Sequence, residues 1–180
     1  MDDFGNAVQA GLVGALETMK GLLDQAEAHA VEREDDVTTL LHAQLYSDMF
    51  PLWRQVPQAC NVARRCVDRL TGKPIKDPPR PVAELAALRA QLDETIAYVR
   101  ACDASTVAAT EGEVLIAKLA KQPVRLTGRT YFGNFAMPNL LFHVVTAYNI
   151  LRSRGVKVGK HAYLRPLIDA GAPVASEDSA

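Results

Sequence analysis

Apolar side chains recur at intervals of three and four residues in four long stretches of the chain, about 4–30, 48–70, 81–102 and 130–153. This spacing places them on one face of an α-helix, so the pattern predicts four long amphipathic helices. Four such helices bury their apolar faces most readily against one another, as a four-helix bundle twisted like a coiled coil. The predicted fold class is therefore all-α.

The connections between these helices differ in character. Residues 71–81 contain four prolines and one glycine, which predicts an extended loop. Residues 113–119 and 124–127 are rich in β-forming side chains and predict a short β-hairpin between the third and fourth helices. Connections this long do not require simple up-down topology and permit crossovers. We expect a single domain over residues 1–165 and a disordered tail over residues 166–180, which turn small and polar.

Glycines and a proline interrupt two of the predicted helices. Gly5, Gly11, Gly14 and Gly21 each weaken the first helix by up to about 1 kcal/mol relative to alanine. A helix that tolerates them is held by packing, or lets a neighbouring element approach closely. Pro138 should bend the fourth helix, because it lacks the backbone N–H and clashes with the preceding turn.

The fourth helix is the best candidate for a functional site. It is apolar on most sides, so it must be largely buried, yet it carries Asn139, His143 and Tyr148. Polar groups inside a bundle must find partners or cost free energy. Asp48 and Arg54, near the start of the second helix, complete the candidate set. An exposed Arg54 at a cleft would suit an anionic ligand, whereas a paired Arg54 would be a structural salt bridge.

Composition narrows the classes of function. The 180 residues carry a net charge of −1 and have a pI near 6.4, which favours neither nucleic acid nor an anionic membrane as a partner. The acidic start lacks the features of a signal peptide, and the longest apolar stretch, 135–151, is too polar for a membrane span. We expect a soluble cytoplasmic protein.

Recognisable catalytic motifs do not occur in the sequence. The three cysteines include no CxxC pair and predict buried thiols in a reducing compartment rather than a disulfide framework. Neither a glycine-rich phosphate loop nor a GxSxG elbow occurs. Cys60 lies on the apolar face of the second helix, which argues against a role as a nucleophile.

Three runs of sequence resemble a known family. They are LYSDMFPLWRQVPQACNVA from Leu45, LTGRTYFGNFAMPNLLFHVVTAYNILRSRGVKVGKHAYL from Leu126, and a weaker pattern around Leu85 to Tyr98. Together they resemble a bacterial family of unknown function grouped with the DinB/YfiT-like proteins, up to Leu164. The resemblance implies a DinB-like four-helix bundle with long crossover connections, often a homodimer.

The same resemblance implies a metal site. Members of the wider superfamily commonly bind a divalent metal through three histidines, one from the second helix and two from the fourth. Some act as thiol-dependent transferases or hydrolases. Here residues 48–70 contain no histidine, and the fourth helix has His143 alone, with Asn139 and Ala147 at a distance of four residues. The implied set of ligands is incomplete.

Three environments for His143 remain open. It could ligate zinc, nickel or iron with donors that only the fold brings close, such as His42, Asp48 or His161. It could be hydrogen-bonded inside the bundle, to Asp48, a tyrosine or a backbone carbonyl. In the third case, His143 and Asn139 hold a small ligand in a metal-free polar pocket.

These environments give three hypotheses of function. The first is a small-molecule-binding or stress-associated protein whose metal site around His143 has diverged or been lost. The second is a metal-dependent transferase or hydrolase. The third is a non-catalytic homodimeric module, favoured by the 48% share of hydrophobic residues and by the glycines of the first helix, which permit close helix approach.

Overall fold

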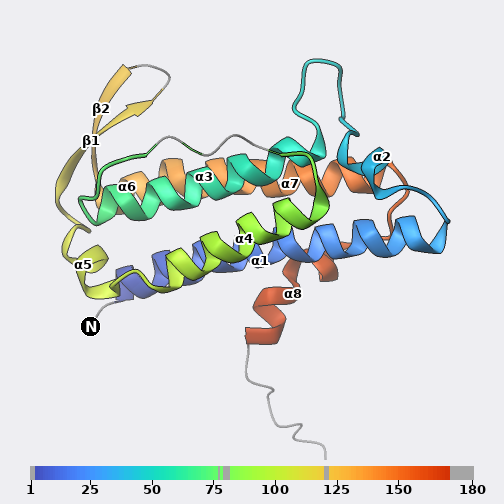
Figure 1. The fold of residues 1–180 in the computed structure, drawn as a ribbon. Helices are drawn as coiled ribbons and strands as arrows, with labels where there is room; N and C mark the ends of the chain where they lie inside the picture. Colours follow the sequence, from blue (N-terminus) through green and yellow to red (C-terminus); the bar gives the residue numbers. More distant parts are fainter. Residues whose placement is uncertain (1–2, 77, 79–81, 120–121, 171–180) are drawn as a thin grey trace, which may run out of the picture.

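The structure is a computed structural model that describes residues 3–76, 78, 82–119 and 122–170. Four long helices lie side by side (Figure 1): α1 (Asp3–Glu32), α3 (Leu52–Leu70), α4 (Leu85–Arg100) and α7 (Met137–Ser153). The predicted all-α bundle is therefore confirmed. Each of the four helices packs against two others, in the cyclic order α1, α4, α3, α7. Their apolar faces meet in one core, in which Leu16, Leu52, Leu92 and Leu140 are fully buried.

Contacts along the helices fix their relative directions. Helices α1 and α4 are antiparallel, because Arg89 at the start of α4 pairs with Glu27 near the end of α1, with 2.9 Å between Nη1 and Oε2. At the other end, the Gln9 amide donates to the carbonyl of Arg100 over 2.9 Å. Helices α1 and α7 are parallel, since the ring of Phe4 packs edge-on against Phe132 just before α7.

Helix α3 runs in the same direction as α4 and opposite to α7. Its middle and its last turns contact the middle and the last turns of α4 through the pairs Cys60–Gln91 and Asp68–Tyr98. The bundle therefore has two parallel neighbouring pairs, and the connection between α3 and α4 must cross its whole length. An extended chain advances about 3.3 Å per residue and a helix about 1.5 Å, so residues 71–84 are long enough. The predicted long crossover is confirmed.

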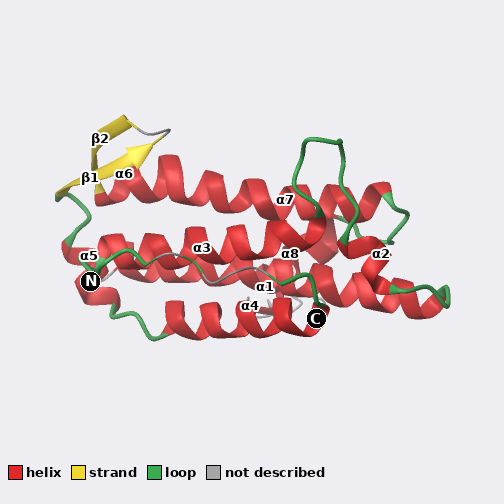
Figure 2. Cartoon of the chain, turned by 45° about the horizontal axis from the view of Figure 1, so that its top comes forward, coloured by secondary structure: helices red, strands yellow, loops and turns green. Residues whose placement is uncertain are grey.

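We call this connection, residues 71–84, the strap. It leaves α3 through Gly72, whose positive φ of 68° suits a glycine after a helix. It begins at the end of the bundle where α3 finishes and enters α4 at the opposite end (Figure 2).

Shorter elements close the two ends of the bundle. Helix α2 (Val37–Leu41) lies near the end of α1, while α5 (Ala104–Ala109) and the hairpin of β1 (Val114–Leu119) and β2 (Gln122–Thr127) lie at the opposite end (Figure 1). The strands pair antiparallel, from Val114 opposite Thr127 to Leu119 opposite Gln122. The predicted hairpin is thus confirmed. Helix α8 (Lys160–Ala170) contacts α1, where the Thr18 hydroxyl donates to the carbonyl of Tyr163.

The segment predicted as one helix over 130–153 has three parts. Helix α6 (Gly128–Tyr131) passes into a π-helical turn, η1 (Phe132–Ala136), which continues into α7. In this turn the N–H of Met137 donates to the carbonyl of Phe132, five residues earlier. The wider turn directly precedes Pro138, which has no N–H to continue the α-helical pattern. The α-helical pattern is therefore interrupted next to Pro138, and the interruption is a π-helical turn.

Three predicted boundaries differ from the structure. The second helix begins at Leu52 rather than near residue 48, because Pro51 takes an extended conformation with ψ of 166°. The third begins at Leu85 rather than at Pro81, which lies outside the described residues. Helix α8 continues to Ala170, past residue 166 where we expected the tail to begin. Residues 171–180 lie outside the described part of the chain.

Candidate ligand-binding site at His143

His143 lies in the middle of α7, on the face turned toward α3, and is only 9% exposed. Its Nδ1 is 2.8 Å from Oε1 of Gln55, in the second turn of α3. Gln55 is itself 2% exposed, and its Nε2 donates to the carbonyl of Phe50 over 2.8 Å. A short chain of hydrogen bonds therefore links the backbone before α3 to the imidazole on α7.

This chain fixes the tautomer of His143. Because the Gln55 amide nitrogen is the donor to Phe50, the Gln55 oxygen faces His143 as an acceptor. Nδ1 must then carry the proton, and Nε2 keeps a free lone pair. Burial lowers the pKa of His143 below its ordinary value of 6.5, so the ring is neutral at pH 7.

The second nitrogen of the ring is not fully buried. Every buried side-chain nitrogen or oxygen in the described part of the chain has a hydrogen-bond partner, and Nε2 of His143 takes part in none of those bonds. It therefore lies at the accessible edge of the imidazole. A neutral imidazole with one fixed N–H and one accessible lone pair can accept a hydrogen bond or act as a base.

An exposed aromatic side chain lies at each end of this hydrogen-bond chain. Phe142 is 58% exposed, and its ring packs edge-on against the imidazole with 5.4 Å between centroids. The ring of Phe50, 40% exposed, carries the guanidinium of Arg54 at 4.0 Å from its centroid. Arg54 thus lies over an aromatic ring, rather than in the salt bridge considered from the sequence.

The other predicted site residues lie at varying distances from this centre. Asn139 is half-buried one turn before His143 on α7, where the helix repeat places it on the same side. Tyr148 packs edge-on against Tyr163 of α8, with centroids 6.1 Å apart. Asp48 is exposed in the turn before α3, and His143 finds its partner in Gln55 instead.

Gln55 is the site residue that sequence reasoning missed. It belongs to α3, whose buried face is otherwise apolar, and its neighbours Val56 and Leu52 are fully buried. A glutamine beside such a stripe is a detectable signal, because a buried amide needs a partner. The sequence does not identify that partner, since Gln55 and His143 are far apart in the chain.

The side chains around His143 do not fit the three-histidine site that the family resemblance implies. Gln55 stands on the second bundle helix where an imidazole would be needed, and Asn139 stands one turn from His143 on α7. Neutral amide oxygens are poor ligands for zinc and nickel. Within the described ranges, His, Cys, Asp and Glu side chains do not gather in threes that could hold an ion.

The cysteines are placed as buried thiols. Cys60 and Cys66 are fully buried, and desolvation raises their thiol pKa values to about 11 and about 12, respectively. A thiol in that environment stays protonated at pH 7 and is a poor nucleophile. Cys102 is half-buried, and its pKa is also raised by desolvation.

Fold and site together define a DinB-like helical bundle in which a single buried imidazole is held by an amide. The chain belongs to the family described as "Domain of unknown function (DUF1993)", which matches residues 7–164. It is also similar to a crystal structure of a DinB family member protein from Shewanella denitrificans. The two sequences are 31% identical over 98% of this chain and 99% of that chain, with a TM-score of 0.81.

Two further findings are negative. Curated proteins give no match to this sequence. Across the described residues, the helices all lack either the length or the apolar character needed to cross a bilayer.

Proposed function

We propose that this DinB-like protein binds a small molecule at His143, with the lone pair of Nε2 accepting a hydrogen bond from the ligand. The observation that supports the proposal is the chain from Phe50 through Gln55 to His143, which fixes a neutral imidazole with its second nitrogen accessible. An imidazole held in one tautomer before the ligand arrives loses little freedom on binding.

The surroundings suggest the character of the ligand. Phe142 offers an exposed aromatic surface directly beside the imidazole. A suitable ligand carries a hydrogen-bond donor next to an apolar group, so that it satisfies Nε2 and covers the ring of Phe142. Arg54 lies over the ring of Phe50, the residue whose carbonyl ends the hydrogen-bond chain, and offers a positive charge to a ligand that also carries an anionic group.

The proposal is tested by a thermal-shift screen of small molecules against the wild-type chain and the variant His143→Gln. Glutamine keeps a polar group but removes the imidazole lone pair. True ligands should raise the melting temperature of the wild type and lose most of that shift in the variant. Asn149→Gln, on an exposed position of the same helix, is the matched control and should bind as the wild type does. Ligands that stabilise wild type and His143→Gln equally would refute the site.

A further inference from the structure

The hairpin at one end of the bundle has two outer edges, because among the described residues its strands pair only with each other (Figure 1). The N–H of Gly128 donates to the carbonyl of Glu113, which lies opposite it when the register is continued by one pair. Hydrogen-bonded and non-hydrogen-bonded pairs alternate along an antiparallel ladder, so Leu115 turns its backbone groups toward β2. Val114 and Ile116 therefore turn theirs away from β2, toward the outer edge of β1.

The outer edge of β2 is closed to further strands. Pro123 lies opposite Lys118, and the same alternation makes this an outward-facing position of β2. Proline has no N–H, so the edge lacks a donor there. Arg125, the next outward-facing residue, is exposed and adds a charge. Proline and charge are features by which proteins prevent strands from adding to an edge.

The outer edge of β1 is open. In the described part of the chain, the outward N–H and C=O groups of Val114 and Ile116 have no hydrogen-bond partner. Backbone groups without a protein partner are bonded to water, so this edge is accessible. The side chains of Val114 and Ile116 are 64% and 63% exposed, and the stretch Val114–Ala117 contains neither proline nor charge. Free backbone groups beside exposed apolar side chains are the features that an added strand covers.

A second copy of β1 matches this edge in an antiparallel arrangement about a two-fold axis. With Leu115 on the axis, Val114 of each copy lies opposite Ile116 of the other, and each such pair can exchange two hydrogen bonds. The exposed apolar side chains of the two copies then lie side by side on one face of the sheet. No like charges meet, because the paired segments are uncharged. Since the edge of β2 is closed, the pairing ends at two copies instead of growing into a fibre.

We propose that the outer edge of β1 is an interface between two copies of this chain, which together form a four-stranded antiparallel sheet with the two β1 strands at its centre. The interface is self-complementary, as two-fold symmetry requires. The proposal does not depend on the site at His143.

Light scattering of the full chain over a series of micromolar concentrations tests the proposal, and the wild type should reach the mass of a dimer. Ile116→Lys should weaken dimerisation by at least about tenfold, because it removes an apolar contact and brings two cations together across the axis. Val31→Lys makes the same kind of change at a position of α1 that is 73% exposed, and it should dimerise as the wild type does. A monomeric wild type, or a dimer that Ile116→Lys weakens no more than Val31→Lys does, would overturn the proposal.

Amide hydrogen exchange in the wild type locates the interface without any substitution. The N–H groups of Val114 and Ile116 should exchange freely at low concentration and become protected as the dimer forms. The N–H of Leu115, which belongs to the ladder with β2, is the internal control and should be protected at both concentrations. A dimer in which Val114 and Ile116 gain no protection would show that the copies meet elsewhere, and would overturn the proposal. Circular dichroism checks that Ile116→Lys keeps the fold, as the exposure of Ile116 predicts.

Discussion

The proton on His143 is positioned by a side chain that is not itself ionisable. Gln55 accepts from Nδ1 because its own amide nitrogen is held by the carbonyl of Phe50. Gln55 is almost fully buried and Nδ1 of His143 lies against it, so each of these two groups depends on the other for a partner. The pair joins the start of α3 to the middle of α7.

The pair should show its interdependence in a double-mutant cycle. Gln55→Leu leaves the buried Nδ1–H without an acceptor and should lower the free energy of unfolding by about 1–3 kcal/mol. Adding His143→Leu removes the orphaned donor and should recover part of that loss. Chemical denaturation of the four proteins measures the coupling. Additive losses would show that the hydrogen bond contributes nothing of its own.

The lowered pKa of His143 also predicts a pH dependence of stability. Burial lowers the pKa of the folded protein below the 6.5 of an unfolded chain, so the unfolded state binds the proton more readily. The contribution to stability is complete above pH 6.5 and is lost as the pH falls toward the folded-state pKa. Unfolding by urea at a series of pH values should show this loss in the wild type and a smaller one in His143→Gln. Identical profiles would contradict the prediction.

At the scale of elements, glycines of α1 decide how closely neighbours approach. A Cβ on Gly5 would overlap the carbonyl oxygen of Ala104, at the start of α5, whereas a Cβ on Gly21 would meet open space. Gly11 lies against the side chains of Phe132 and Met137. The elements that approach α1 closely at Gly5 and Gly11 therefore belong to the same chain. These two glycines lend no support to a dimer interface.

This difference predicts opposite effects for two alanine substitutions in one helix. Gly5→Ala should destabilise the protein by about 1–3 kcal/mol, because the backbone of α5 must move. Gly21→Ala, the matched control, should stabilise it by up to about 1 kcal/mol, since alanine is the better helix former. Thermal and denaturant unfolding measure both. Stabilisation by Gly5→Ala would contradict the contact between α1 and α5.

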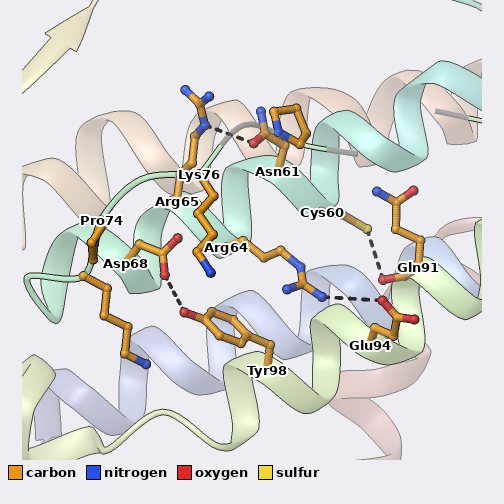
Figure 3. Close-up of a pocket in the computed structure, with 12 residues that line it drawn as sticks. Cys60, Asn61, Arg64, Arg65, Asp68, Pro74, Lys76, Gln91, Glu94 and Tyr98 are labelled. Atoms are coloured by element: carbon orange, nitrogen blue, oxygen red, sulfur yellow. Dashed lines mark hydrogen bonds and ion pairs between the residues drawn. The ribbon is translucent and has the colours of Figure 1, made fainter. Parts of the chain in front are cut away.

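At the scale of the whole molecule, the parallel arrangement of α3 and α4 has the largest consequence. It requires the strap, and described residues of the strap line a cavity together with α3 and α4 (Figure 3). The antiparallel arrangement of α3 and α7 places Gln55 opposite His143. The site proposed at His143 therefore follows from how the helices are connected and directed.

The donor set around His143 predicts little bound metal. Elemental analysis of untagged protein, purified without chelator, should give well below one equivalent of zinc, nickel or iron. The variant Gln55→His/Asn139→His supplies two more imidazoles near His143 and is the positive control, which should gain zinc. One full equivalent in the wild type would instead favour the metal-dependent transferase or hydrolase, with His143 as a ligand.

The oligomeric state of the whole molecule can also be predicted. The family resemblance and the apolar composition predict a homodimer, which light scattering at micromolar concentration should detect. A monomeric mass would count against the dimeric module. The measurement is independent of the ligand site at His143.

The spacing of apolar residues determined the four helices and their all-α class, and the β-forming side chains of 113–119 and 124–127 determined the hairpin. These patterns depend on neighbours in the chain. The spacing also singled out His143 and Asn139, since polar groups in an apolar helix are visible locally. Helix directions, the contact between Gln55 and His143, and the placement of Arg64 and Lys73 against the ring of Tyr98 were decided by tertiary structure alone. These features join residues that are distant in sequence, and no local pattern encodes which distant side chain will be the partner.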